Sequence, residues 1–297
     1  MKRANIFLTV TALQTDATQA VNSKTQFAQI EDYKIAYRSV GKGEPFILCS
    51  RFRGNLDDWD PAFLDALATK YQVITFNYKG LASSTGAPHS NILGFAKDVV
   101  DLADVLGFKK IIVGGWSLGG WVAQIVTTEF SERILHTILI GTKPPGKVEY
   151  PLEEIFINTA YKPDYTIEDE TILFFEPKSK ISSEAAIQSH ERITERKEKD
   201  PKVKPELWEF YGKCHDDYAN DPYNSRQKIM STNIPILVIS AHHEVCFPPE
   251  NWFELNNKLP TTQLIIIPQA GHGPHHQYPK MVADYIDNFI QNIKYDG

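Results

Sequence analysis

The chain has 297 residues, of which 42% are hydrophobic and 23% charged, and its formal net charge at pH 7 is −6. This length allows one large α/β domain or two small ones, with a substantial buried core. The acidic balance argues against a nucleic-acid partner, because phosphate backbones bind to basic surfaces. No apolar run approaches the roughly 20 residues that a membrane-spanning helix needs.

The cysteines and the N-terminus bear on localisation. Three scattered cysteines imply no disulfide framework, so we expect a cytoplasmic protein. Residues 1–24 leave export open, because a basic start precedes a short apolar run that resembles a weak signal peptide, with Ala20 as the candidate cleavage residue. Polar residues interrupt that run, and the alternative is a flexible polar leader.

Strands and helices alternate from residue 25 onward. In the first half of the chain, we expect strands at 26–30, 33–39 and 45–49, a helix that Asp60 caps and that runs to residue 68, a strand at 72–76 and a helix at 95–106. Strands at 111–113 and 134–140 follow, with a helix between them. The last expected elements are strands at 234–239 and 263–267 and an amphipathic helix at 281–293. The first two strands have the alternation of a hairpin, and the later ones are apolar runs typical of strands buried on both faces. This alternation predicts a mostly parallel sheet with helices on both faces.

The alternation is interrupted between residues 143 and 232. This segment mixes aromatic and charged residues, and no strand pattern returns before residue 234. We interpret 143–232 as a lid of helices inserted into a core made of residues 25–142 and 233–297. The density of both charge signs near the middle of the insertion is typical of a solvated helix face with i,i+4 pairs.

Residues 115–119 have the sequence Gly-Trp-Ser-Leu-Gly, a G-x-S-x-G motif. The motif lies between a β-branched strand and a helix-compatible run, and in that context it forms a sharp turn that exposes a nucleophile. Glycines are needed because side chains at their positions would collide in such a turn. Ser117 is therefore the candidate nucleophile, and the alternative is a glycine-rich turn with only a structural role.

A serine nucleophile needs a general base, and the base needs an acid that orients it. On sheets of this kind the three residues follow different strands, in the chain order serine, acid, histidine. His272 follows the last strand between small residues and is the candidate base, with His275 and His276 as competitors whose structural alternative is a surface position. Glu244 follows the penultimate strand and is the candidate acid, with Glu149 as the fallback.

The oxyanion of an acyl-transfer intermediate needs two backbone N–H donors. We expect them at Leu118, directly after the serine, and at Phe52, in the loop after the third strand. Arg51 and Trp116 lie beside these positions and are the candidate substrate contacts; for Arg51 the alternative is an ion pair with a nearby aspartate. Aromatic residues of the insertion are candidates either for an acyl pocket or for the core of the lid: Phe156, Tyr161, Phe174, Phe175, Trp208 and Tyr211.

No spacing of histidine and cysteine matches a closed tetrahedral metal site, and at least one histidine is needed as the base. We therefore expect no functional metal. The expected partner is a small-molecule ester or lactone, and the sequence does not give the oligomeric state.

These residues resemble the α/β-hydrolase superfamily. The likeness rests on the serine turn at 115–120, the Gly-His-Gly loop at 271–273 and the Asn-Tyr-Lys-Gly turn at 77–80. It covers residues 26–142 and 233–294. The resemblance implies an eight-stranded, mostly parallel sheet and cofactor-free hydrolysis through an acyl-enzyme.

A finer resemblance is to the acyl-homoserine-lactone lactonases of this fold. It rests on the Gly-Trp-Ser-Leu-Gly-Gly sequence, the Gly-Thr-Lys-Pro-Pro stretch at 141–145 and a glutamate as the acid. The chain departs from the superfamily pattern at two places. Ser50 and Arg51 stand where members commonly have His-Gly, and Glu244 stands where aspartate is usual, so the substrate does not transfer with the resemblance.

Three functions follow from these residues. The leading hypothesis is a serine hydrolase that cleaves a carboxylic ester or lactone through Ser117, His272 and Glu244. A cofactor-free perhydrolase would use the same triad, and a ligand-binding member of the fold without turnover is the third alternative. Epoxide or haloalkane hydrolysis is disfavoured, because those enzymes have an aspartate at the position of Ser117.

Overall fold

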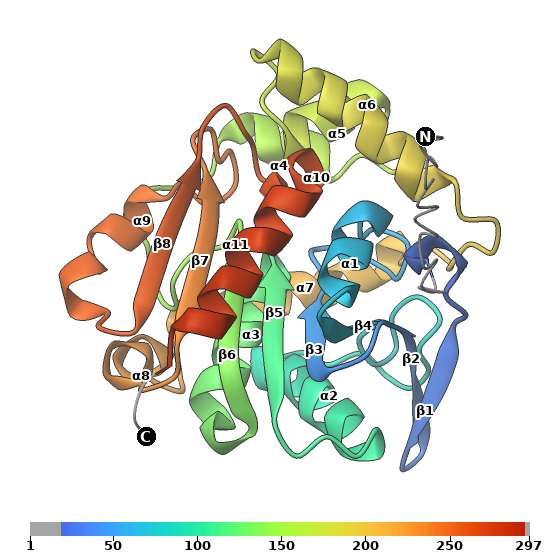
Figure 1. Ribbon diagram of the computed structural model, residues 1–297, viewed down its shortest axis with the longest axis vertical. Helices are drawn as coiled ribbons and strands as arrows, with labels where there is room; N and C mark the ends of the chain where they lie inside the picture. Colours follow the sequence, from blue (N-terminus) through green and yellow to red (C-terminus); the bar gives the residue numbers. More distant parts are fainter. Residues whose placement is uncertain (1–18, 295–297) are drawn as a thin grey trace, which may run out of the picture.

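The computed structural model describes residues 19–294, and in that range eight strands form one sheet in the order β1-β2-β4-β3-β5-β6-β7-β8 (Figure 1). The strands are β1 (Gln26–Ile30), β2 (Tyr33–Val40), β3 (Glu44–Cys49), β4 (Tyr71–Phe76), β5 (Ile111–Trp116), β6 (Ile134–Ile140), β7 (Ile236–Ala241) and β8 (Thr262–Ile267). The pairs β1–β2 and β2–β4 are antiparallel, and all other pairs are parallel. The α/β fold with an eight-stranded, mostly parallel sheet is confirmed.

Helices cover both faces of the sheet. Those of the described residues are α1 (Pro61–Ala68), α2 (Ile92–Val105), α3 (Leu118–Glu129), α4 (Glu154–Ala160), α5 (Ile167–Phe174), α6 (Lys180–Thr194), α7 (Trp208–Asn220), α8 (Ser225–Ser231), α9 (Glu250–Phe253), α10 (Pro274–Gln277) and α11 (Pro279–Asn292), with short 3-10 turns at Ala20–Asn22, Ser131–Arg133, Pro205–Leu207 and Asn256–Lys258. Helices α1 and α11 pack together in front of the sheet in Figure 1, and α2 and α3 pack together behind it. Each layer buries its own apolar cluster against the strands.

Most expected elements lie within a few residues of their positions, and the differences have local causes. Helix α2 begins earlier than expected because the side chain of Asn91 accepts a hydrogen bond from the Gly94 amide at 2.8 Å and caps the helix. Strand β7 begins two residues later than expected: Pro235 has no N–H to donate, and the first ladder bond from this strand runs from Ile236. Helix α10 has no counterpart in the sequence analysis.

The chain between β6 and β7 forms α4 to α8. Helices α4, α5 and α6 lie beyond the carboxyl ends of the central strands, at the top of Figure 1. Helix α7 packs against α2, and α8 packs against α3. The two ends of the segment therefore have different positions: its first helices cover the edge of the sheet, and its last helix lies in the layer behind the sheet.

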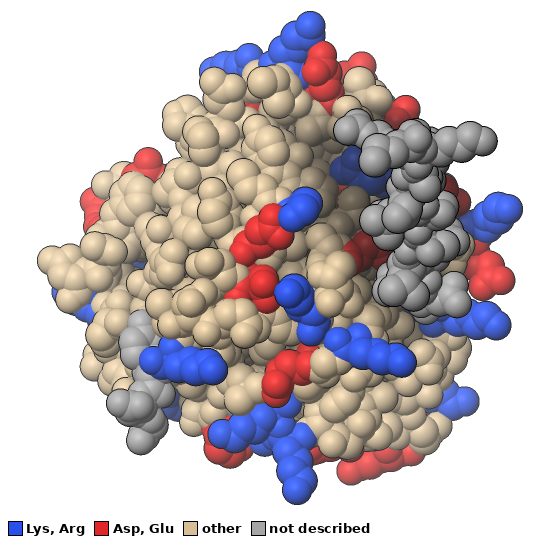
Figure 2. Space-filling view, in the orientation of Figure 1, with Lys and Arg blue, Asp and Glu red and all other residues tan. Residues whose placement is uncertain are grey.

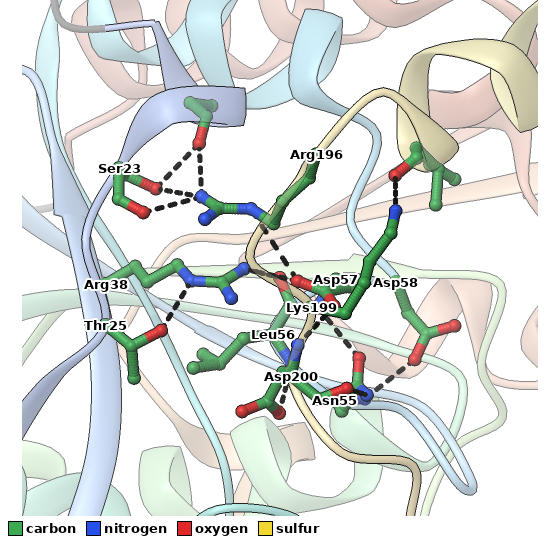
Figure 3. A network of polar contacts seen from close by, with 12 residues as sticks. Ser23, Thr25, Arg38, Asn55, Leu56, Asp57, Asp58, Arg196, Lys199 and Asp200 are labelled. Atoms are coloured by element: carbon green, nitrogen blue, oxygen red, sulfur yellow. Dashed lines mark hydrogen bonds and ion pairs between the residues drawn. The ribbon is translucent and has the colours of Figure 1, made fainter.

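A buried polar network fixes the loop after α6 to the core (Figure 3). The Arg196 guanidinium donates to the backbone oxygen of Ser23 at 2.7 Å and lies 3.6 Å from the carboxylate of Asp57. Asp57 also pairs with Arg38 at 2.7 Å. Three chain segments that are distant in sequence meet at these charges, so the network ties the start of the described chain to both β2 and the segment after α6.

The leader expected at residues 1–24 falls mainly on residues 1–18, outside the described part of the chain. Residues 19–24 differ from the expected flexible leader. The Ala20 amide donates to Asp65 on α1 at 2.7 Å, and the Ala20 side chain is buried. This stretch is ordered because α1 and Arg196 supply partners for its backbone.

Acidic and basic side chains are interspersed on the face shown in Figure 2, with wide uncharged areas between them. Neither sign forms a continuous field over this face. Among residues 19–294, every helix is too short or too polar to cross a membrane.

Candidate active site

Ser117 stands at a strained turn between β5 and α3. Its φ is +60° and its ψ −122°, a combination that residues other than glycine rarely adopt. The Ser117 amide donates to the Ile140 carbonyl at 2.9 Å, which continues the parallel ladder for one residue past the end of β5. The turn thus has the strand–turn–helix form that the sequence predicts, with Ser117 at the carboxyl edge of the sheet.

The glycines of the motif are required by close backbone approaches. A Cβ atom on Gly115 would lie 2.0 Å from the carbonyl oxygen of Gly119. A Cβ atom on Gly119 would lie 1.9 Å from the carbonyl oxygen of Cys49, the last residue of β3. The second contact also places the loop after β3 directly against the first turn of α3.

His272 and Glu244 form a buried pair. Nδ1 of His272 lies 2.7 Å from Oε1 of Glu244, and the two residues are 1% and 4% exposed. The same carboxylate oxygen accepts hydrogen bonds from the amides of Cys246 at 3.0 Å and Phe247 at 3.2 Å. These amides fix the carboxylate in its loop, so Glu244 holds the imidazole in one orientation.

The elements around this pair bring it next to the serine turn. The indole N–H of Trp116 donates to the backbone oxygen of His272 at 2.8 Å. Gly141 follows β6, and a Cβ atom there would lie 2.6 Å from the same oxygen and 3.0 Å from Oε2 of Glu244. Nε2 of His272 is buried without a hydrogen-bond partner among the described residues. The loop that carries His272 is therefore held against the residue that precedes Ser117.

The two expected oxyanion donors lie on the same cavity as Ser117. Leu118 is the first residue of α3, where the amide has no acceptor within the helix. Phe52 lies three residues after β3, in the loop that Gly119 touches, and its side chain lines the cavity together with Leu118 and Ser117. Both amides are thus positioned on segments that meet at the serine turn.

The cavity above Ser117 has a volume of about 500 Å³. Its wall is mainly aromatic and aliphatic. Its aromatic and aliphatic lining includes Phe52, Leu118, Trp121, Val148, Leu152, Phe156, Ile157, Tyr161, Tyr211 and Phe247. Lys143 on the same wall was not singled out by the sequence analysis. The signal that points to it is its place three residues after β6, in a loop at the same edge of the sheet as Ser117.

The structure divides the aromatic residues of the insertion. Phe156, Tyr161 and Tyr211 line the cavity beside Ser117. Phe174 and Phe175 line a different cavity, of about 410 Å³. Trp208 packs against the ring of Phe52, with ring centroids 5.9 Å apart, and so contacts the loop after β3 from outside the cavity.

Arg51 and Trp116, which the sequence analysis expects to contact the substrate, do not line the cavity beside Ser117. Arg51 pairs with Asp58 at 2.5 Å, and its guanidinium lies 4.8 Å from the ring centroid of Phe174. Trp116 is 1% exposed and donates to His272. Both residues line the second cavity instead. The ion pair that the sequence offered as the alternative for Arg51 is the one that forms, and Trp116 contacts the histidine loop.

His275 and His276 are not surface residues, as their structural alternative assumed. Both are at most 3% exposed and pack against the Trp116 ring, with centroids 4.7 Å away. Burial lowers the pKa of His276 to about 4 and holds the pKa of His275 well below its usual value. Their imidazoles are therefore neutral at pH 7 and lie behind Trp116. Glu149, the fallback acid, is exposed, and the neighbouring Glu254 raises its pKa.

Comparisons with known proteins agree with this fold. Residues 44–279 match the family described as alpha/beta hydrolase fold. A structure described as an alpha/beta hydrolase fold protein from Chitinophaga pinensis superposes with a TM-score of 0.82, at 24% identity, and covers 93% of this chain and 100% of its own. A putative esterase/lipase of Mycoplasma pneumoniae is 22% identical over 87% of this chain and 93% of its own length.

A putative non-heme bromoperoxidase of Mycobacterium tuberculosis is 24% identical over 88% of this chain and 98% of its own length. The names of these relatives differ, and their identities are similarly low, so they do not select one substrate. The residues that match the family run from β3 to the start of α11 and include strands before and after the helical segment between β6 and β7. The chain belongs to the α/β-hydrolase fold family.

Proposed function

We propose that the protein cleaves a carboxylic ester or lactone through an acyl-enzyme formed on Ser117. One observation carries the proposal: a serine in a strained turn lines a cavity of about 500 Å³, and the buried His272–Glu244 pair is held against the residue before it. This arrangement has the parts that acyl transfer requires.

In the proposed reaction, Oγ of Ser117 attacks the carbonyl carbon and its proton passes to Nε2 of His272. Glu244 stabilises the imidazolium that forms. The amides of Phe52 and Leu118 donate to the oxyanion. The imidazolium then gives its proton to the leaving alcohol, and a water molecule activated by His272 releases the acid and restores the serine.

We also propose that the segment 143–232 provides the lid of this site. Its aromatic side chains Phe156, Tyr161 and Tyr211 form one wall of the cavity, and they come from α4 and α7 or directly follow α4. The substrate's acyl or alcohol part would lie against them, because such walls bury apolar ligand surface. The lid would thereby select substrates by shape.

The experiment is covalent labelling with a fluorophosphonate probe followed by mass spectrometry of the labelled peptide. Labelling of Ser117 is expected, together with turnover in a panel of p-nitrophenyl esters and lactones of increasing acyl length. Ser117→Ala should remove both, whereas Ser131→Ala, at an exposed position, is the matched control. Folded protein that is not labelled at Ser117 and turns over no ester or lactone would contradict the proposal.

A second candidate is the perhydrolase reaction, in which hydrogen peroxide replaces water as the acceptor of the acyl group and a peracid leaves. The observation that favours testing it is the similarity to proteins named as non-heme haloperoxidases. The same Ser117 acyl-enzyme serves both reactions, so labelling does not separate them. Comparing ester hydrolysis with peracid formation in acetate and peroxide does.

The third hypothesis is a ligand-binding member of the fold without turnover, and the departure from the family pattern at Ser50-Arg51 motivates it. Arg51 turns toward Asp58 and away from the cavity. The Phe52 amide after it stays on the segment that touches α3. Loss of turnover with retained ligand binding in Ser117→Ala would decide for an enzyme.

A further inference from the structure

One ammonium group on the wall of the active-site cavity has no anionic partner in residues 19–294. Lys143 lines the cavity together with Ser117 and Trp121, although only 5% of the residue is exposed. No carboxylate oxygen of the described chain lies within ion-pair distance of its Nζ atom. An ammonium buried without an anion is unfavourable, and such groups cluster at functional sites.

The backbone holds Lys143 firmly in place. Its carbonyl oxygen accepts hydrogen bonds from Nε2 of Gln124 at 3.0 Å and from the Tyr218 hydroxyl at 3.1 Å. The side chain extends over two aromatic rings, with Nζ 5.6 Å from the Trp121 centroid and 5.8 Å from the Tyr218 centroid. These distances are near the outer limit of about 6 Å for a cation–π contact, so the rings guide the stem and leave the charge largely uncompensated.

Other titratable groups near Lys143 do not neutralise it. The Cys246 thiol faces it from the loop after β7, and burial raises the pKa of that thiol, which stays uncharged. Arg226 on α8 adds a like charge, although it is turned toward the carbonyl of Pro145 at 2.8 Å. On α7, His215 and Asp216 line the same cavity, but the Asp216 side chain is 80% exposed.

The arginines near the site are engaged elsewhere. Arg51 pairs with Asp58. Arg53 donates hydrogen bonds to the backbone oxygens of Ala160, Lys162 and Pro163. These hydrogen bonds fix the turn after α4. Among the described residues that line the cavity beside Ser117, Lys143 is the one lysine or arginine.

We propose that Lys143 binds a carboxylate carried by the substrate, so that the preferred substrates are esters or lactones with an acidic group. The inference rests on the proposed ester hydrolysis and names its substrate class. A carboxylate in the cavity would accept a charge-assisted hydrogen bond from Nζ, and the apolar part of the substrate would lie on the aromatic wall. Burial lowers the pKa of Lys143 to about 8, which leaves the ammonium mostly protonated at pH 7.

The test compares pairs of esters that differ only in one charge. The first pair is p-nitrophenyl hydrogen adipate and its methyl ester, with the carboxylate on the acyl side. The second pair is para-acetoxybenzoate and its methyl ester, with the carboxylate on the leaving group. The measured quantity is the ratio of kcat/KM between the charged and the neutral ester, in the wild type, in Lys143→Met and in Lys147→Met.

The expected result is a ratio above one for at least one pair, which falls by about tenfold or more in Lys143→Met. Lys147 is exposed on the same segment, so its variant tests the loss of one charge without a change in the cavity. In the wild type the ratio should also fall as the pH rises through about 8, because the binding cation loses its proton. Equal ratios in the wild type and Lys143→Met for both pairs would overturn the proposal.

Failure of the proposed reaction is distinguished by a binding measurement. Calorimetric titration of Ser117→Ala with monomethyl adipate and dimethyl adipate needs no turnover. Tighter binding of the monoanion that is lost in Ser117→Ala/Lys143→Met supports the carboxylate site even if no ester is hydrolysed. Equal affinities for the two probes exclude a site for an acyl-side carboxylate even if the esters are substrates, and the para-acetoxybenzoate pair then decides the leaving-group side.

Discussion

The Nδ1 atom of His272 lies 2.7 Å from Oε1 of Glu244, and this contact is set by strand register. Glu244 comes three residues after β7 and His272 five residues after β8. The two strands are parallel neighbours, and their last residues, Ala241 and Ile267, are paired. Both loops therefore start at the same level of the sheet edge, and short loops are enough to bring acid and base together.

Replacing Glu244 by glutamine tests this pair. Glutamine keeps the length and the acceptor for the Cys246 and Phe247 amides, but it removes the charge that stabilises the imidazolium. We expect kcat for ester hydrolysis to fall by roughly a hundredfold or more. Circular dichroism should show that the variant is folded like the wild type. The exposed Glu250→Gln is the control. A folded Glu244→Gln protein with wild-type kcat would exclude Glu244 as the orienting acid.

The positions of Ser117, Glu244 and His272 followed from the sequence because each lies within five residues of the end of a strand. Strand ends are visible as the ends of apolar runs, and parallel strands place their carboxyl ends at one edge. The contact of Arg51 with Phe174 and the burial of His275 were not accessible in this way. Both depend on contacts between segments far apart in the chain, such as the approach of Phe174 and Trp116, which no local pattern records.

The insertion was also predictable only in outline. Its helices carry aromatic residues on more than one face, so the pattern does not say which ones face the cavity. The division between Phe156 and Tyr211 on the cavity wall and Trp208 outside it depends on how α4 and α7 dock. For the same reason Lys143 was not singled out as a site residue, since its ammonium lies near Trp121 and Tyr218, which belong to two different helices.

A stability comparison of two glycine-to-alanine changes tests the serine turn. In Gly119→Ala the new Cβ atom would meet the Cys49 carbonyl at 1.9 Å, so the turn or β3 must shift. We expect a loss of roughly 3 kcal/mol or more in the free energy of unfolding, measured by urea titration. Gly212 lies in α7 with open space around its Cβ position, so Gly212→Ala should be neutral or stabilising by roughly 0.5–1 kcal/mol. Equal effects of the two changes would contradict the close approach.

The buried histidines predict an acid-sensitive fold. The pKa of His276 is about 4 in the folded protein against an ordinary value of 6.5, so between these pH values the unfolded chain binds more protons. The free energy of unfolding should therefore fall as the pH drops through this window, by roughly 2 kcal/mol between pH 7 and pH 5 from His276 alone. The low pKa of His275 acts in the same direction.

The measurement is urea unfolding at several pH values in the wild type and in His276→Gln. Glutamine does not titrate, so the slope of stability against pH should be smaller in this variant, whatever its absolute stability. His242 is exposed, and His242→Gln should keep the wild-type slope. An unchanged slope in His276→Gln would mean that this imidazole is not held neutral in the folded protein.

The network around Arg196 predicts that the segment after α6 stabilises the start of the described chain. Arg196→Met keeps most of the stem but removes the guanidinium donor to the carbonyl oxygen of Ser23 and one of the donors to that of Ala20. Asp57 keeps its ion pair with Arg38, so its carboxylate stays paired in the variant. We expect a loss of roughly 2–4 kcal/mol in the free energy of unfolding, because the buried acceptors lose charge-assisted bonds.

Lys202 supplies the matched control, because it also forms an ion pair, with Asp164, but both side chains are more than three-quarters exposed. Lys202→Met should change the free energy of unfolding by less than about 1 kcal/mol, as is usual for exposed pairs. Limited proteolysis adds a local readout: cleavage near residues 19–24 should accelerate in Arg196→Met before global unfolding. If both variants were equally stable and equally resistant to cleavage there, Arg196 would contribute no more than a surface charge. The difference between them thus measures what burial adds to a polar network.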